Sequence, residues 1–240
     1  MKNISWPKLV KKPSGVEILV LAPHMDDEII GCGGTLLKHS QAGDKISVVY
    51  MTDGSKGIPG KQPNYDLIKL RKEEAMKSNT LLGIQDVIFL DIEDSSDESW
   101  ESYEELLYNI LIDNRPELIY LPWYLDIHPD HQKTNFLLKK IVEKSQFKCT
   151  VCAYEVWYPL NPNILVNITK QMPVKLQAIS EHKSQLELIK YSRLITSLNS
   201  YRACFIPLPG LDYAEAFYES DCQSYLELIN YYMKGIYIAK

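Results

Sequence analysis

A dense group of charged side chains follows the first apolar run of this chain. The run, residues 16–21, has the length and composition of a buried strand, and Ala22-Pro23-His24-Met25-Asp26-Asp27-Glu28 comes directly after it. Three neighbouring carboxylates cost free energy unless a cation or hydrogen-bond donors offset their charge. A divalent metal ion would do so, which constrains the fold to one that brings further ligands to this turn.

A second group of the same kind lies over a hundred residues later in the chain. His128-Pro129-Asp130-His131 follows another apolar, strand-like run at residues 118–121. Both groups combine imidazole with carboxylate, and both are placed soon after a strand. Together they predict a mononuclear metal hydrolase.

Strand and helix patterns alternate along residues 16–156. The predicted strands are 16–21, 45–51, 86–91, 117–121 and 148–154; the predicted helices are 29–41, 65–82, 100–112 and a helix that follows 128–131 and reaches 145. This alternation predicts an α/β, Rossmann-like fold, with a mostly parallel sheet and helices on both faces. The loops at the carboxyl ends of parallel strands share one rim, where ligands bind, so both charged groups are expected there.

The remaining residues have a less regular pattern. We expect residues 1–240 to form one domain, with the α/β core at 16–156 and a helical, loop-rich part at 157–240. A short edge strand is predicted at 164–168, and a helix over 169–198 with a break near Ser192. The aromatic-rich stretch from Tyr218 to Tyr237 is a candidate interface for a homo-oligomer.

Three side chains form the predicted metal site. His24 and Asp27 are three residues apart across a turn, and His131 adds a ligand from the opposite loop. Two imidazoles and a carboxylate leave one position open, which is typical of catalytic rather than structural zinc. We expect one Zn²⁺ per chain, although Fe²⁺ or Co²⁺ suits the same donors. In isolation, Asp26 and Asp27 would more often cap a helix N-terminus.

Three further residues are the predicted catalytic groups. Asp26, beside the ligand Asp27, could accept a proton from the attacking water. His128 could donate a hydrogen bond to a developing oxyanion, or a proton to the leaving amine. Asp130 could orient an imidazole ring.

The two motifs resemble those of a known family, the LmbE-like or PIG-L zinc-dependent N-acetylglucosaminyl deacetylases. The resemblance covers roughly residues 16–217 and includes Pro23 to Glu28 with Gly31-Cys32-Gly33-Gly34, Thr52-Asp53-Gly54, Arg71 to Ala75, His128 to His131, His182-Lys183-Ser184-Gln185 and Tyr213 to Phe217. It implies a Rossmann-like fold and removal of an N-linked acyl group from an amino sugar.

The resemblance also implies roles for individual residues. It makes His24, Asp27 and His131 the zinc ligands, Asp26 the general base, and His128, helped by Asp130, the group that stabilises the transition state or delivers a proton. Arg71 would bind sugar hydroxyls. One position departs from the family, because Met25 replaces its usual proline, which changes loop stiffness. The resemblance assigns no role to His182 or Glu215.

Other functions were weighed against this one. The same metal core could hydrolyse a non-sugar amide, such as a thiol conjugate, because the motifs describe the bond more than the group that carries it. A metal-stabilised binding protein without turnover would need neither Asp26 nor His128. Nucleotide binding is disfavoured because Gly31, Gly33 and Gly34 do not form GxGxxG after the strand; close helix–sheet packing explains them.

The composition indicates which partners and which location to expect. The net charge is −5, which gives no support for nucleic-acid binding, and the Lys-rich stretch from Lys8 to Lys12 is predicted to be a solvated terminus. No apolar run approaches the roughly 20 residues of a membrane span, and no signal-peptide pattern is present, so a cytoplasmic protein is expected.

Several residues with reactive or aromatic side chains have ordinary explanations. Cys149 and Cys152 form a CxxC, but on a strand these positions point to opposite faces, so buried strand cysteines are expected. His39 is predicted to be solvated on a helix surface. Four aromatic residues in rim loops could stack on a sugar or serve packing equally well; they are Trp123, Tyr124, Trp157 and Tyr158.

Overall fold

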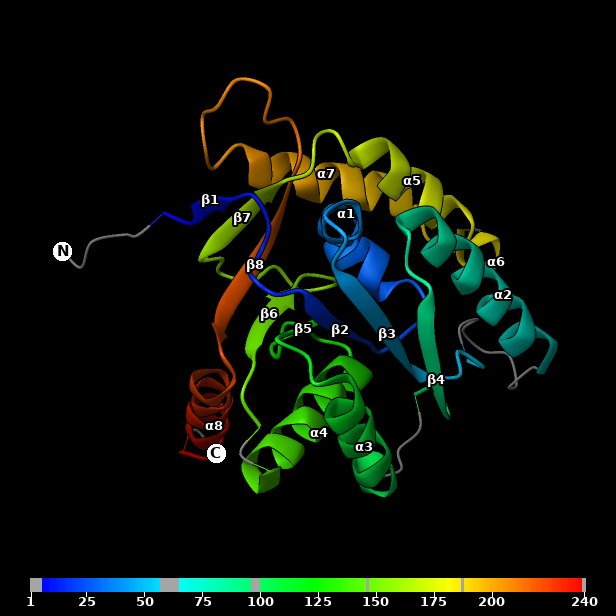
Figure 1. Ribbon diagram of the computed structural model, residues 1–240, viewed down its shortest axis with the longest axis vertical. Coiled ribbons are helices and arrows are strands. Elements are labelled where there is room, and N and C mark those ends of the chain that lie inside the picture. Colours follow the sequence, from blue (N-terminus) through cyan, green and yellow to red (C-terminus); the bar gives the residue numbers. More distant parts are fainter. Residues whose placement is uncertain (1–5, 57–64, 96–99, 146, 187, 239–240) are drawn as a thin grey trace.

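An eight-stranded sheet runs through the protein. The computed structural model describes residues 6–56, 65–95, 100–145, 147–186 and 188–238. The strands lie in the order β1 (Lys8–Val10), β7 (Ile164–Asn167), β8 (Ala214–Asp221), β6 (Thr150–Tyr154), β5 (Leu118–Pro122), β2 (Glu17–Ala22), β3 (Lys45–Thr52) and β4 (Asp86–Ile92) (Figure 1). β8 is antiparallel to both of its neighbours, and the other pairs are parallel.

Helices cover both faces of this sheet, as the alternating pattern predicts. One face carries α1 (Asp27–Gln41), α2 (Tyr65–Leu82), α5 (Met172–Ser180), α6 (Lys183–Leu186) and α7 (Tyr191–Ala203). The other carries the 3₁₀ turn η1 (Trp100–Tyr103), α3 (Glu104–Asn114), α4 (Pro129–Ser145) and α8 (Cys222–Ile238) (Figure 1). The Rossmann-like α/β prediction is therefore confirmed.

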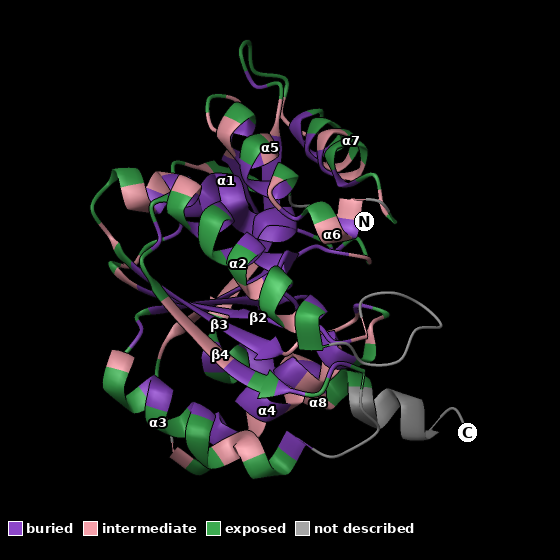
Figure 2. Cartoon of the chain, turned by 90° about the vertical axis from the view of Figure 1, so that its right-hand side faces the viewer, coloured by how far each residue is buried: buried purple, intermediate pink, exposed green. Residues whose placement is uncertain are grey.

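The central strands are buried on both faces, which explains their continuous apolar runs. Along β2, Ile18, Val20 and Ala22 face one core cluster, whereas Leu19 and Leu21 face the other. Figure 2 shows the strands β2 and β3 as buried ribbons between the two helical layers. This burial fixes the carboxyl ends of the strands, and with them the loops that carry the charged groups.

The glycines of α1 allow this helix to lie close to its neighbours. A Cβ at Gly31 would lie 2.1 Å from the Tyr154 ring, and one at Gly34 would lie 2.8 Å from Ile168. A Cβ at Gly33 would meet nothing nearer than 3.4 Å. Close packing of Gly31 and Gly34 is thus confirmed as an explanation of this stretch.

Two predictions about the edge of the sheet are wrong, and one about a helix is wrong in part. Residues 8–10 are not a free terminus, although Lys8 and Leu9 are exposed: they form β1, and the Lys8 amide donates to the Asn163 carbonyl at 2.9 Å. Since β1 covers β7, that strand is not at the edge. The predicted helix over 169–198 is three helices, and the break expected near Ser192 lies directly before α7, which begins at Tyr191. β1 is too short to have a recognisable strand pattern, and the helices end at tertiary contacts that the local sequence does not reveal.

His39 is a further correction, because it is fully buried rather than solvated. Its Nε2 lies 2.8 Å from the Tyr120 hydroxyl and its Nδ1 lies 2.7 Å from Asp44 Oδ2. Both partners are distant or follow the helix, so helical periodicity alone gave no sign of them. Two polar partners allow an imidazole to be buried at little cost.

Of the two cysteines in the CxxC, Cys152 is a buried residue of β6, as expected, whereas Cys149 precedes the strand and is half-buried. Cys152 lies in the core cluster beside α1, whereas Cys149 packs against the cluster on the opposite face, as expected for positions i and i+3. All five cysteines are free thiols.

No helix in the described part of the chain is long and apolar enough to cross a membrane. Tyr231 and Tyr232 are exposed on α8, so a homo-oligomer that uses this stretch stays a prediction.

Candidate metal centre

The carboxyl ends of four neighbouring strands bring the two charged groups together, as the fold class predicts. His24 follows β2, Asp53 follows β3, and His128 and His131 follow β5. The loop after β4 adds Asp94, which the sequence analysis did not single out. Asp94 is buried and adjoins His24, and its only sequence signal was its place after a strand on the same rim.

The three predicted ligands converge on one point. Asp27 Oδ2 lies 3.0 Å from His24 Nδ1 and 3.2 Å from His131 Nε2, and the two nitrogens are 3.4 Å apart. Tetrahedral zinc with ligands at about 2.0–2.2 Å places its donor atoms about 3.3–3.5 Å from one another. The donors present therefore fit a small tetrahedral ion with one position left open.

The second nitrogen of His24 faces two further carboxylates. His24 Nε2 lies 3.4 Å from Asp130 Oδ2 and 3.5 Å from Asp94 Oδ1, so these three residues also form a group able to hold a cation. A histidine ligand usually gives its other nitrogen to a carboxylate, which fixes the ring. This arrangement favours Nδ1 of His24 as the ligand atom and Asp94 and Asp130 as the groups that orient it.

The electrostatics favour positive charge at this point. Burial alone would lower the pKa of His24, but Asp27, Asp130 and Asp94 together raise it well above 6.5. Burial also opposes the shift at His131, whose pKa Asp27 and Asp126 raise to about 9. The pKa of Asp27 is lowered despite its burial, because both imidazoles face it. An excess of carboxylate around two imidazoles is the environment that a divalent cation stabilises.

The Asp26 side chain does not cap the helix that it precedes. It occupies the N-cap position of α1, yet its side chain makes no capping hydrogen bond. Instead Oδ2 accepts a hydrogen bond of 2.8 Å from the Tyr191 hydroxyl and lies 4.0 Å from Arg71 Nη2. Burial and the charge of Asp27 raise the pKa of Asp26, against the opposing effect of Arg71. A raised pKa makes a carboxylate a stronger base.

His128 lies at the mouth of the site, with its side chain 30% exposed. Its ring centre is 4.5 Å from that of His24, and burial together with the positive charge of His24 lowers its pKa. The Asp130 carboxylate is nearer to His24 than to His128, because its Oδ2 lies 3.4 Å from His24 Nε2 and 3.9 Å from His128 Nδ1. The backbone amide of Asp130 donates a hydrogen bond of 3.3 Å to His128 Nδ1. The Asp130 carboxylate also accepts a hydrogen bond from the Ser95 amide at 3.0 Å.

A cavity of about 200 Å³ opens onto this cluster. It is lined by His24, Asp26, Asp27, Lys56, Arg71, Asp94, Ser95, His128, Trp157, Gln185 and Tyr191. The buried Arg71 reaches it from α2 and donates to the Gly54 carbonyl at 3.1 Å. Gly54 has φ of +68°, and a Cβ there would lie 2.8 Å from Arg71 Nη1, so glycine is required at this turn.

Of the four aromatic candidates, Trp157 is the one that lines the cavity. Trp123 is buried and its ring packs 4.4 Å from that of Tyr124 and 5.2 Å from that of Tyr218, which is a core role. Tyr158 is 42% exposed and is not among the lining residues. Tyr191, which sequence reasoning missed, also lines the cavity, because it is the first residue of α7 and its hydroxyl reaches Asp26.

His182 and Glu215 contact the helices that carry site residues. His182 is fully buried, with Nε2 3.0 Å from Ser78 Oγ on α2, the helix that carries Arg71. Glu215 accepts hydrogen bonds from the amides of Gly34 and Thr35 and from Lys175 at 2.6 Å. This buried ion pair ties β8 and α5 to α1. Met25, where the family has proline, is fully buried in the core and contributes no ligand.

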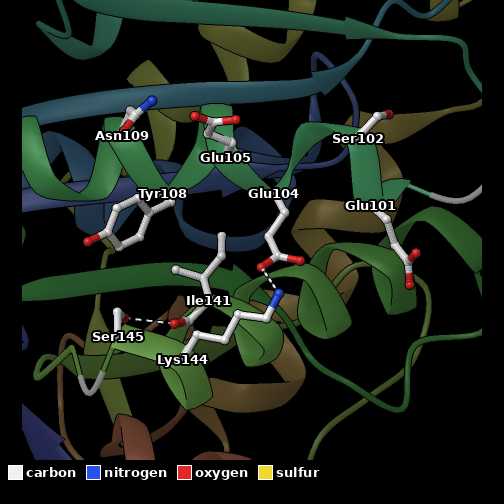
Figure 3. Close-up of a pocket in the computed structure, with 9 residues that line it drawn as sticks. All are labelled: Glu101, Ser102, Glu104, Glu105, Tyr108, Asn109, Ile141, Lys144 and Ser145. Atoms are coloured by element: carbon white, nitrogen blue, oxygen red, sulfur yellow. Dashed lines mark hydrogen bonds and ion pairs between the residues drawn. The ribbon is translucent and has the colours of Figure 1, made fainter.

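A larger hollow of about 710 Å³ lies elsewhere, over η1, α3 and α4. Figure 3 shows Glu104 paired with Lys144, and Ser145 donating to the Ile141 carbonyl, with Tyr108 and Glu105 nearby. None of the predicted site residues lines it. Its side chains form surface ion pairs and include no imidazole, so it lacks the donor set that lines the smaller cavity.

Comparison with known proteins shows the family of this chain. The family model described as PIG-L, GlcNAc-PI de-N-acetylase, matches residues 19–142, more than half of the 240 residues, and spans both charged motifs. The chain belongs to the PIG-L family. The resemblance inferred from the motifs is thereby confirmed.

Individual relatives of this PIG-L chain include named deacetylases. The diacetylchitobiose deacetylase of Thermococcus kodakarensis is 29% identical over 186 residues, covering 70% of each chain. A Bacillus anthracis protein, named as a probable N-acetyl-alpha-D-glucosaminyl L-malate deacetylase 2, is 26% identical and covers 70% of this chain and 80% of its own. Among solved structures, the N,N'-diacetylchitobiose deacetylase of Pyrococcus horikoshii, complexed with its inhibitor MPG, has a TM-score of 0.76 at 27% identity. That match covers 86% of this chain and 84% of the other.

Proposed function

We propose that this PIG-L protein is a zinc-dependent hydrolase that removes the N-acetyl group from an amino sugar or its conjugate. One observation carries the proposal: His24 Nδ1, Asp27 Oδ2 and His131 Nε2 meet within 3.4 Å of one another, beside the buried carboxylate of Asp26. This geometry places the ligands beside one small cavity, whose walls include His24, Asp27 and the base Asp26. The activities named for its relatives support the same reaction class.

The residues divide the work between holding a metal ion and moving protons. His24, Asp27 and His131 would hold the ion, which when bound lowers the pKa of water and polarises a carbonyl oxygen. Asp26 accepts the proton of the attacking water, and the Tyr191 hydroxyl holds its carboxylate in place. His128 donates a hydrogen bond to the developing oxyanion, or a proton to the departing amine.

The cavity suits a small substrate group. At about 200 Å³ it is below the roughly 300–1,000 Å³ of sites for drug-sized ligands, so it suits one sugar ring rather than a long chain. At its walls Arg71 and Gln185 offer hydrogen-bond donors to hydroxyl groups, and the Ser95 hydroxyl oxygen offers an acceptor. The Trp157 ring also lines the cavity and can stack on the apolar face of a sugar.

Acetate release tests the proposal. The panel is N-acetylglucosamine, N,N'-diacetylchitobiose and an N-acetylglucosaminyl malate, assayed with zinc-reconstituted wild type and with Asp26→Asn, which keeps an acceptor for Tyr191. We expect release by the wild type and a loss of at least about 100-fold in the variant, with one zinc retained per chain. Parallel reconstitution with Fe²⁺ or Co²⁺ identifies the metal that supports the fastest turnover.

Two other outcomes would redirect the assignment. Zinc binding without acetate from any sugar would favour a non-sugar amide, such as a thiol conjugate, or a binding protein without turnover. A wild type that binds no metal would contradict the proposal at its base.

A further inference from the structure

Asp126 is a buried carboxylate that the reaction scheme does not use. It is 0% exposed, lies two residues before His128, and is absent from the walls of the cavity. No lysine or arginine is paired with it among the ion pairs of the described residues. A buried carboxylate needs hydrogen-bond donors to offset its charge, so its partners define its purpose.

One oxygen of Asp126 faces the metal ligands. Oδ1 lies 3.2 Å from Nδ1 of His131 and accepts a hydrogen bond of 3.0 Å from the His128 amide. His131 Nδ1 is buried and makes no hydrogen bond of regular geometry in the described part of the chain, where its ion-pair contact is with Asp126 Oδ1. A proton held on Nδ1 by this carboxylate leaves the lone pair on Nε2, the atom that faces Asp27.

The other oxygen faces a different loop. Oδ2 accepts hydrogen bonds from the amides of Trp157 at 2.9 Å and Tyr158 at 3.3 Å, in the loop that follows β6. Trp157 lines the cavity, and its ring lies 6.3 Å from the ring of Tyr191, the partner of Asp26. The same carboxylate thus contacts a proposed metal ligand on one side and anchors a wall of the cavity on the other.

We propose that Asp126 is a positioning residue that couples the ligand His131 to the aromatic loop at residues 157–158. Fixing His131 orients the carboxylate, and the oriented carboxylate sets where Trp157 lies against the bound sugar. Metal binding and the substrate wall are therefore linked through a single side chain. This inference rests on the proposed function, since it assumes that His131 is a ligand.

Glu155 provides a matched control for this loop. Its Oε1 accepts a hydrogen bond of 2.8 Å from the Leu160 amide and it pairs with Arg202, so it anchors the other end of the same loop. Among the described residues it makes no hydrogen bond or ion pair with His24, Asp27 or His131, the proposed ligands. Glu155→Gln therefore loosens the loop without disturbing the imidazole.

The test uses zinc alone and needs no turnover. Zinc affinity is measured on metal-free protein by competition with a chelator, and Trp157 emission is followed during the titration, with Trp157→Phe identifying its share. We expect Asp126→Ala to weaken zinc about 10–100-fold and to abolish the zinc-induced change in Trp157 emission. Glu155→Gln should keep the affinity of the wild type.

Several results would overturn the coupling. Asp126→Ala that binds zinc as the wild type does would remove the link to His131, and wild-type Trp157 emission that ignores zinc would remove the link to the loop. Should the alanine variant fail to fold, Asp126→Asn takes its place. Asparagine keeps one oxygen acceptor, so it can hold either His131 or the loop but not both. The same two readouts, zinc affinity and Trp157 emission, then test the coupling. A wild type that binds no zinc would contradict the proposed function itself, and this inference with it.

Discussion

The Tyr191 hydroxyl donates a 2.8 Å hydrogen bond to Oδ2 of Asp26, joining the start of α7 to the turn before α1 across 165 residues of sequence. Tyr191 is 3% exposed, and this bond lowers the pKa that burial and Asp27 raise at Asp26. The C-terminal part of the chain therefore helps to set the strength of the proposed base.

Removing this hydroxyl should move the pH profile of activity. Tyr191→Phe deletes a bond that stabilises the ionised form of Asp26, so the pKa of Asp26 rises further. The base is active only when ionised, so the acid limb of kcat/KM should shift to higher pH, with a loss of about 10-fold below neutral pH. Tyr201→Phe, at an exposed tyrosine of the same helix, is the control. An acid limb that stays in place would show that Asp26 does not titrate in the reaction.

His182 should make the fold acid-sensitive. Burial and the charge of Arg71 lower its pKa to about 3, compared with 6.5 in the unfolded chain. Between these two values the unfolded chain binds the extra proton, so the contribution is neutral above pH 6.5 and stability falls as the pH drops below it. Each pH unit costs up to about 1.4 kcal/mol.

His182→Asn removes this titration. Its free energy of unfolding in urea should fall less steeply than that of the wild type between pH 6.5 and pH 5, and the difference should be constant from pH 7 to 8. Parallel curves for the two proteins below pH 6.5 would contradict the buried, neutral state of His182.

The glycines of α1 should differ in their tolerance of a methyl group. Gly31→Ala drives a Cβ to 2.1 Å from the Tyr154 ring and should destabilise the protein by about 1–3 kcal/mol. Gly33→Ala has space and gains up to about 1 kcal/mol of helix propensity. Urea denaturation of both variants measures the contrast, and equal stabilities would show that α1 does not pack on Tyr154 as described.

Asp27 should be the residue on which metal binding depends most. Asp27→Asn removes the charge that both imidazoles face, so zinc affinity should fall by more than about 100-fold. Removal of zinc from the wild type should also lower its melting temperature, since about 2.7 kcal/mol is lost relative to zinc at 100 times its Kd. Asp53→Asn serves as the control. Asp53 lies on the same rim, where its carboxylate accepts hydrogen bonds from the amides of Ser55 and Asp94. Equal zinc affinities for the two variants would place the metal elsewhere.

Local sequence patterns predicted the alternating core and the meeting of its two motifs. Apolar runs such as residues 16–21 are buried on both faces of the sheet, and in a parallel sheet their ends share one rim. The convergence of His24 and His131 therefore followed from fold class and strand order, without any knowledge of the loops between them.

Residues that depend on long-range contacts escaped prediction. Asp126, Asp94 and Tyr191 are recognisable only once β5, β4 and α7 are packed around His24 and Asp26. His39 has the surroundings of a surface residue in sequence, and only the buried Tyr120 hydroxyl explains it. The three residues of β1 carry too little pattern to be distinguished from a solvated terminus.

The position of the bound metal tests the central claim most directly. A crystal of the zinc-loaded protein, measured at the zinc absorption edge, would give an anomalous peak whose ligands can be read from its distances. We predict one peak per chain, about 2.0–2.2 Å from His24 Nδ1, Asp27 Oδ2 and His131 Nε2, beside the Asp26 carboxylate. A peak between His24 Nε2, Asp94 and Asp130, or no peak at this rim, would contradict the account.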